Sequence, residues 1–220
     1  MQLGLWAEAT QITQLASICD NVQARGCRYS IQTIESNGSE MRTLLSEAEL
    51  NAGVQKLASE IDSHYGIRPL TVIAIMTGSL VLFADLIRRL SMPQRVGVVQ
   101  ASSYRGGTTS GQLQVDDAMM IEVKGRDVLL VDDIFDTGKT LDRVSGMMLE
   151  HGATSVQTAV LLHKLTQHSV EMRPDFVAFE IPDEFVVGYG LDYLDMYRNL
   201  PYLAVLSPAE IEATAAESET

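Results

Sequence analysis

The chain has 220 residues, a formal net charge of −13 and a hydrophobic fraction of 46%, which suits a single domain with a sizeable core. No apolar run approaches the length of a membrane span, the first ten residues lack the basic and apolar regions of a signal peptide, and the negative charge disfavours a broad nucleic-acid-binding surface. The two cysteines, Cys19 and Cys27, fit a reducing compartment better than a disulfide-built secreted protein, so we expect a cytoplasmic protein. From the apolar pattern and the charge we expect partners that include no membrane and no nucleic acid.

Apolar residues at helical spacing predict a first helix at residues 7–24, and a turn follows at 36–39. Ser46 and Glu49 have the spacing of a capping box, which starts a second helix. Predicted strands lie at residues 71–76, 95–101, 128–131, 157–162, 176–179 and 203–206, another helix lies at 80–90, and residues 208–220 form an acidic, frayed helical tail. Strands that alternate with helices indicate an α/β fold with a central, mostly parallel sheet flanked by helices.

The most informative segment runs from residue 128 to residue 141. Residues 128–131 are branched and apolar, which predicts a strand buried on both faces. Asp132 and Asp133 follow where the strand ends, and open α/β sheets bind their ligands at that edge. A Thr-Gly-Lys-Thr turn at residues 137–140 then opens a helix, whose first N–H groups can bind an anion. The carboxylates can bind sugar hydroxyls or a metal ion, and the N–H groups beside them can bind a phosphate. This combination predicts a site for a sugar phosphate.

Two other interpretations of this segment were weighed. A nucleotide-binding P-loop needs a glycine five positions before Gly138, but Asp133 stands there and its carboxylate would repel phosphate. A strand, turn and helix with acids that are merely solvated is the plainer alternative, because one aspartate at a strand end is common. Three acids within five residues, Asp136 being the third, favour a functional site.

The same residues resemble a known family. The run Asp-Asp-Ile-Phe-Asp-Thr-Gly-Lys-Thr at 132–140 resembles the phosphoribosyl diphosphate (PRPP) motif of type I phosphoribosyltransferases. Residues 181–193, with Tyr197 and Arg198 after them, are similar to the purine-binding end of the hypoxanthine(-guanine) phosphoribosyltransferases, and residues 76–79 and 83–85 are similar to that family's diphosphate loop and helix. The resemblance covers residues 44–206, which implies a type I phosphoribosyltransferase fold with a small hood. Residues 1–43 would then be an N-terminal, helical extension, and residues 207–220 a tail.

The resemblance implies an enzyme of purine salvage. Such an enzyme transfers the 5-phosphoribosyl group from PRPP to hypoxanthine or guanine, giving IMP or GMP and diphosphate, with Mg²⁺ required. Its partners would be PRPP, a 6-oxopurine base and further copies of the chain in a homodimer or homotetramer. The balance among hypoxanthine, guanine and xanthine stays open at this point.

The resemblance also implies roles for residues of the PRPP motif. Asp132 and Asp133 would hold the ribose hydroxyls, directly or through Mg²⁺, although the family usually has glutamate at position 132. Asp136 would handle the N7 proton of the purine as N9 attacks the sugar; on the residues alone, a helix cap is as good an interpretation. The 5′-phosphate would lie in a cradle formed by Thr137, Gly138, Lys139 and Thr140.

Further positions carry the remaining roles that the resemblance implies. Lys164 would donate to the purine O6, Phe185 would stack on the ring, and the backbone of Val186 would contact the ring edge. Asp192 would also lie near the purine and would serve as a second acidic Mg²⁺ site on the diphosphate side. The diphosphate would be bound by Thr77, Gly78 and Arg198. Thr77 occupies a place where some relatives carry lysine or arginine, and the loop there often contains a cis non-proline bond.

Residues 102–111 are rich in glycine and hydroxyl groups. They resemble the family's lid, in which Ser103 and Tyr104 would exclude water from the reacting sugar; a simple hairpin tip is the alternative. Two other functions were considered for the whole chain. A PRPP-sensing regulator on the same fold is disfavoured by the acidic charge and the intact purine-end motif. A phospho-acceptor domain would have no use for Lys164 and Phe185 at their positions.

Overall fold

The computed structural model describes residues 41–103, 113–116, 121–166 and 169–218. Met41–Thr220 is a compact unit. The predicted helix at residues 7–24, the turn at 36–39, the two cysteines and Tyr104 lie outside the described residues. Within the described part of the chain, no helix is long and apolar enough to cross a membrane.

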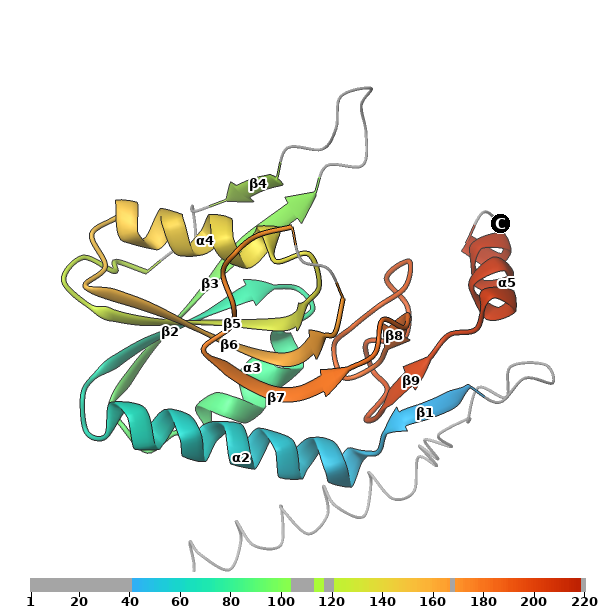
Figure 1. Ribbon diagram of the computed structural model, residues 1–220, viewed down its shortest axis with the longest axis horizontal. Coiled ribbons are helices and arrows are strands. Elements are labelled where there is room, and N and C mark those ends of the chain that lie inside the picture. The colour runs from blue at the N-terminus through green and yellow to red at the C-terminus, as the bar shows by residue number, and fades with distance from the viewer. Residues whose placement is uncertain (1–40, 104–112, 117–120, 167–168, 219–220) are drawn as a thin grey trace, which may run out of the picture. The chain divides into compact units, whose positions relative to one another are not determined.

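The main sheet has six strands in the order β4-β3-β2-β5-β6-β7 (Figure 1). Strands β3, β2, β5, β6 and β7 are parallel, and β4 pairs antiparallel with β3 at one edge. The strands are β2 (Leu70–Met76), β3 (Gln94–Ser103), β4 (Leu113–Asp116), β5 (Asp127–Phe135), β6 (Ser155–Lys164) and β7 (Phe176–Ile181). The predicted α/β fold with a mostly parallel central sheet is confirmed.

Helices cover both faces of this sheet. Helices α2 (Glu47–Tyr65) and α3 (Leu80–Ile87) lie on one face, and α4 (Lys139–Glu150) lies on the other (Figure 1). Alternate residues of β5 point to opposite faces: Leu129 and Val131 belong to the α2–α3 core, while Val128 and Leu130 belong to the α4 core. All four are completely buried, as expected of a strand in a parallel sheet covered on both sides.

The predicted capping box is present at the start of α2. The backbone N–H of Ser46 donates to Glu49 Oε2 at 2.8 Å, and the N–H of Glu49 donates to Ser46 Oγ at 3.4 Å. Helix α3 is shorter than predicted and ends at Ile87 rather than residue 90.

A second, small sheet forms the hood. It consists of β1 (Arg42–Leu45), β9 (Leu203–Val205) and β8 (Val186–Val187), in the order β1-β9-β8 with both pairs antiparallel. The strand predicted at 203–206 therefore exists but belongs to this sheet. Its partners are β1, which precedes the strands of the main sheet in the chain, and β8, which follows them. Helix α5 (Pro208–Ser218) follows, and its Ile211 packs against the hood core.

Candidate active site

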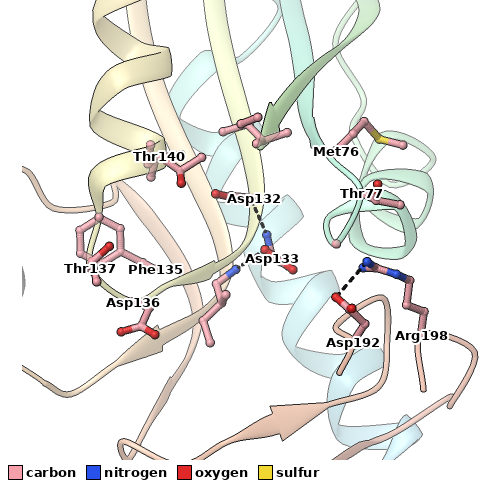
Figure 2. A pocket seen from close by; sticks show the side chains of 16 residues that line it. Met76, Thr77, Asp132, Asp133, Phe135, Asp136, Thr137, Thr140, Asp192 and Arg198 are labelled. Atoms are coloured by element: carbon pink, nitrogen blue, oxygen red, sulfur yellow. Dashed lines mark hydrogen bonds and ion pairs between the residues drawn. The ribbon is translucent and has the colours of Figure 1, made fainter. Parts of the chain in front are cut away.

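A cavity of about 320 Å³ opens at the carboxyl ends of β2 and β5. Three segments line it: the loop after β2, the end of β5 with the start of α4, and the loop that carries Asp192 and Arg198 (Figure 2). A neighbouring cavity of about 210 Å³ is lined in part by Lys164, Phe185 and Val186. Asp133 and Asp136 are among the residues that line both cavities, so the two form adjoining halves of one site at the edge where parallel sheets bind ligands.

Strand β5 carries Asp132 and Asp133 into this site. We predicted that the strand would end at residue 131, but pairing with β6 continues through Phe135, so both acids lie on the strand itself. Asp132 is only 8% exposed, and its Oδ1 accepts the N–H of Asp133 at 3.1 Å. Asp133 Oδ1 accepts the N–H of Ile134 at 2.9 Å. The strand backbone therefore fixes the position of both carboxylates.

The two acids carry charge that the site itself does not neutralise fully. Burial, together with the neighbouring charge of Asp133, raises the pKa of Asp132 well above its usual value. Burial also raises the pKa of Asp133, although hydrogen bonds with Asp132 and from the Ile134 N–H, and to a lesser extent the Arg198 guanidinium, oppose this. Two carboxylates held together in a low-dielectric site favour a bound cation or a shared proton.

The residues predicted to cradle a phosphate lie at the start of α4. Gly138 is the helix N-cap, and the first helical hydrogen bond runs from the N–H of Asp142 to the carbonyl of Gly138 at 3.0 Å. Thr137, Gly138 and Thr140 line the larger cavity, while the side chain of Lys139 is exposed and is not among the lining residues. The N–H groups of the first helical turn have no partner within the helix and suit an anion.

The loop after β2 approaches the acids closely. The Met76–Thr77 peptide bond is cis, which agrees with the expectation from the resemblance. Thr77 and Gly78 line the larger cavity. A Cβ atom on Gly78 would lie 1.8 Å from Asp133 Oδ2, so only glycine fits here without moving the carboxylate. Ser79 fastens the loop to β2, because its hydroxyl donates to the Ile75 carbonyl at 2.6 Å.

Asp192 and Arg198 face the acid pair from the other wall (Figure 2). Their side chains form an ion pair, with Arg198 Nη2 at 2.9 Å from Asp192 Oδ1. Arg198 also donates to the Gly190 carbonyl at 2.9 Å. The sequence motif indicated both residues, but not that they pair with each other.

Lys164, the last residue of β6, lies between two acids. Its Nζ is 3.4 Å from Asp136 Oδ2 and 3.3 Å from Asp183 Oδ1, and its side chain is 11% exposed. Phe185 is 41% exposed and meets the ring of Tyr193 edge-on, with 5.3 Å between centroids. Sequence reasoning missed Asp183 and Tyr193 as neighbours of the site, although both fall within the purine-end motif.

The lid is only partly described. Ser103 is the last residue of β3, and Tyr104 lies outside the described residues. Strand β4 pairs antiparallel with β3, Ser103 opposite Leu113, so the segment between them connects two neighbouring strands. A lid role for Ser103 and Tyr104 stays a prediction.

Comparisons with known proteins agree with this geometry. Residues 42–194 match the family model of the phosphoribosyl transferase domain. The chain is 38% identical over 173 residues to a hypoxanthine-guanine phosphoribosyltransferase of Bacillus subtilis, covering 78% of this chain and 96% of the relative. It is 39% identical over 166 residues to one of Streptococcus pneumoniae, covering 75% and 92%.

Solved structures give the same picture. The crystal structure of a hypoxanthine-guanine phosphoribosyltransferase from Bacillus anthracis, with a HEPES molecule in its active site, superposes with a TM-score of 0.72 at 35% identity, covering 76% of this chain and all of that chain. A hypoxanthine phosphoribosyltransferase from Staphylococcus aureus superposes with a TM-score of 0.71 at 34% identity, covering 76% and 92%.

Proposed function

Because the chain belongs to the phosphoribosyltransferase family, we propose that it is a purine-salvage enzyme that transfers the 5-phosphoribosyl group of PRPP to hypoxanthine or guanine, releasing diphosphate. The observation that carries this proposal is the joining of two half-sites. The buried acid pair and the start of α4 line one cavity, Lys164 and Phe185 line the other, and Asp136 lines both.

The larger cavity suits PRPP. The 5′-phosphate would accept hydrogen bonds from the first N–H groups of α4 and from the hydroxyls of Thr137 and Thr140. Asp132 and Asp133 would accept from the ribose hydroxyls. The diphosphate would then point toward the loop of Thr77 and toward Arg198, which lie on the opposite side of the acid pair from α4 (Figure 2).

The donor set suits Mg²⁺ rather than a metal held by protein alone. The described residues contain no group of three histidine, cysteine or acidic side chains that could hold a metal. Mg²⁺ in nucleotide sites takes one or two carboxylates and completes its shell with substrate oxygens and water. Asp132 and Asp133 would hold one ion and Asp192 a second, and the bound ions would supply positive charge that neutralises the departing diphosphate.

The smaller cavity suits a 6-oxopurine. The Phe185 side chain, which is 41% exposed, would stack on the purine ring. The backbone of Val186 would meet the edge of the purine. Lys164 would donate a hydrogen bond to O6. Adenine has an amino group at that position, which cannot accept this hydrogen bond. A wrong base would leave the ammonium without that acceptor, and sites of this kind discriminate strongly.

Asp136 is the proposed catalytic residue. Its side chain is half exposed and lies at the junction of the two cavities. As N9 of the base forms its bond to C1′ of the ribose and the bond from C1′ to the diphosphate oxygen breaks, the proton on N7 would move to the Asp136 carboxylate. The nearby Lys164 would then donate to O6, so the two side chains act on the same edge of the purine.

The proposal is tested by an ultraviolet assay with PRPP and Mg²⁺, run separately with hypoxanthine, guanine, xanthine and adenine. Rapid turnover of hypoxanthine or guanine, with adenine inert and all activity lost in EDTA, supports the proposal and ranks the three oxopurines. Failure to turn over any base while PRPP still binds by calorimetry would favour a PRPP-sensing regulator instead. The proposal includes a cytoplasmic homodimer or homotetramer, which light scattering of the full chain would distinguish.

A further inference from the structure

The turn between Gly188 and Leu191 has an unusual residue at its first central position. The N–H of Gly188 donates to the Leu191 carbonyl and the N–H of Leu191 donates to the Gly188 carbonyl, each at 3.0 Å, which closes a two-residue turn. Both central residues have positive φ, 50° at Tyr189 and 103° at Gly190, the pattern of a type I′ turn. Asparagine, aspartate or glycine normally occupies such positions, because a bulky side chain is strained there. A tyrosine at this position indicates that its side chain has a structural task.

The Tyr189 side chain is anchored on α3. Its hydroxyl donates to Asp85 Oδ2 at 2.6 Å, and the residue is only 6% exposed. Arg88 donates to the other carboxylate oxygen of Asp85, and Arg89 Nη1 lies 3.5 Å from it. Burial by itself would raise the pKa of Asp85, but hydrogen bonds from Tyr189 and Arg88 outweigh it and lower that pKa. Burial raises the pKa of Tyr189, so the hydroxyl stays the donor and the carboxylate stays the acceptor.

The second central residue of the turn, Gly190, packs against the loop after β2 that is proposed to bind diphosphate. A Cβ atom on Gly190 would lie 2.2 Å from the carbonyl oxygen of Gly78, so the two backbones are in close contact. The N–H of Gly190 donates to the Arg198 carbonyl at 3.0 Å, and the Gly190 carbonyl accepts from Arg198 Nη1 at 2.9 Å. Gly190 therefore lies against both of the groups proposed to bind diphosphate, the Gly78 loop and Arg198.

We propose that Tyr189 is a positioning residue for the diphosphate half of the site. Its hydrogen bond to Asp85 ties the turn to α3, the helix that follows the Gly78 loop in the chain, and this sets the spacing between that loop and Arg198. The inference rests on the proposed function, because it concerns how the same site holds PRPP. Lys164 is held by Asp136 and Asp183, and Phe185 packs against Tyr193, so the side chains proposed to bind the base have anchors other than Tyr189.

The experiment compares Tyr189→Phe with Tyr65→Phe in the full chain. Tyr65 is 3% exposed, and its hydroxyl has no hydrogen-bond partner among the described residues, so the control removes a buried hydroxyl from the far end of α2. Tyr189→Phe is expected to raise KM for PRPP about tenfold, which corresponds to about 1.4 kcal/mol. KM for hypoxanthine should stay within twofold, and Tyr65→Phe should leave both constants unchanged. Calorimetry with Mg²⁺ and diphosphate should show the same tenfold weakening without turnover.

Variants of Asp85 separate positioning from general damage. Asp85→Asn keeps an acceptor for the Tyr189 hydroxyl and should keep KM for PRPP within about threefold of the parent. Asp85→Ala should match Tyr189→Phe, and the double variant should be no worse than either single one.

Two results would overturn the proposal. One is an unchanged diphosphate affinity in Tyr189→Phe. The other is an equal rise of both Michaelis constants, which indicates a general structural role. A parent protein that turns over no base would instead refute the proposed function, and diphosphate calorimetry would still decide the role of Tyr189.

Discussion

Substitution of Gly78 by alanine tests the close contact between the diphosphate loop and the acid pair. The added Cβ would lie 1.8 Å from Asp133 Oδ2 and 2.6 Å from Cγ. Since Cγ itself is too close, rotation of the carboxylate about its last bond does not remove the overlap. The whole carboxylate must retreat by about 1.6 Å to reach the 3.4 Å of ordinary contact, which means leaving its place on the Ile134 N–H.

This displacement should affect activity far more than folding. Losing one hydrogen bond to a charged group costs about 1.5–3 kcal/mol, and a domain of this size loses about 2–4 °C in Tm per kcal/mol. A misplacement of about 1 Å in a reacting geometry costs about 10²-fold in rate. We therefore expect Gly78→Ala to fold, with Tm lowered by several degrees, and to lose at least about 100-fold in kcat/KM for PRPP.

The measurements are thermal unfolding, steady-state kinetics with varied PRPP, and calorimetry of Mg²⁺ with PRPP. Gly146→Ala is the matched control, because nothing lies within 4 Å of its added Cβ in the interior of α4. That change should raise stability by about 0.5–1 kcal/mol without altering kinetics. Should Gly78→Ala keep kcat/KM within threefold, the Asp133 carboxylate does not contact PRPP or its metal, and the reasoning fails.

Three further predictions concern the two half-sites. Asp136→Asn should lower kcat by about 10²–10⁴-fold while the Kd for PRPP from calorimetry changes less than threefold; equal losses in both would remove its role in proton transfer. Lys164→Met should lower kcat/KM for hypoxanthine by about 10–10²-fold, since a hydrogen bond from a charged donor to O6 contributes about 1.5–3 kcal/mol, whereas the exposed Lys56→Met should have no effect in the same assay. The pKa of Asp132 is raised in the folded protein, so the folded state binds a proton more tightly than the unfolded state, and the stability of the ligand-free protein should rise as the pH falls through that raised pKa toward the unfolded value of about 3.9. Asp132→Asn should be the more stable protein at about pH 7 and should lack this dependence in thermal unfolding across pH; a parallel pH profile for the two proteins would contradict the assignment.

Much of the main sheet could be predicted because its signals are local. Residues 128–131 are apolar without interruption, and this pattern alone indicates a strand covered on both faces, as β5 is. The capping box of α2 needs only Ser46 and Glu49, three residues apart. The start of α4 could likewise be placed from the adjacent turn at residues 137–140, although the N-cap is Gly138 and not Asp136, the cap that was considered.

The hood could not be predicted in the same way. Strand β1 has four residues with no alternation of buried and exposed positions, and its partner lies far along the chain, with Arg42 opposite Val205. Strand β8 has two residues, too few for any period to show. Such strands exist because a distant segment completes their hydrogen bonds, so their own residues carry little signal.

The sequence by itself determined the chemistry available to the site: the acid pair, the helix start predicted to bind phosphate, Lys164 at a strand end, and the motif that carries Phe185 and Arg198. These are properties of residue types and of short spacings along one strand, turn or helix. Only the tertiary structure decided how the groups meet. It pairs Arg198 with Asp192, places Lys164 between Asp136 and Asp183, and brings Tyr189 to Asp85 across 104 positions of the chain. Contacts of that kind depend on how separate elements pack, and packing is settled by the fold as a whole rather than by any local pattern.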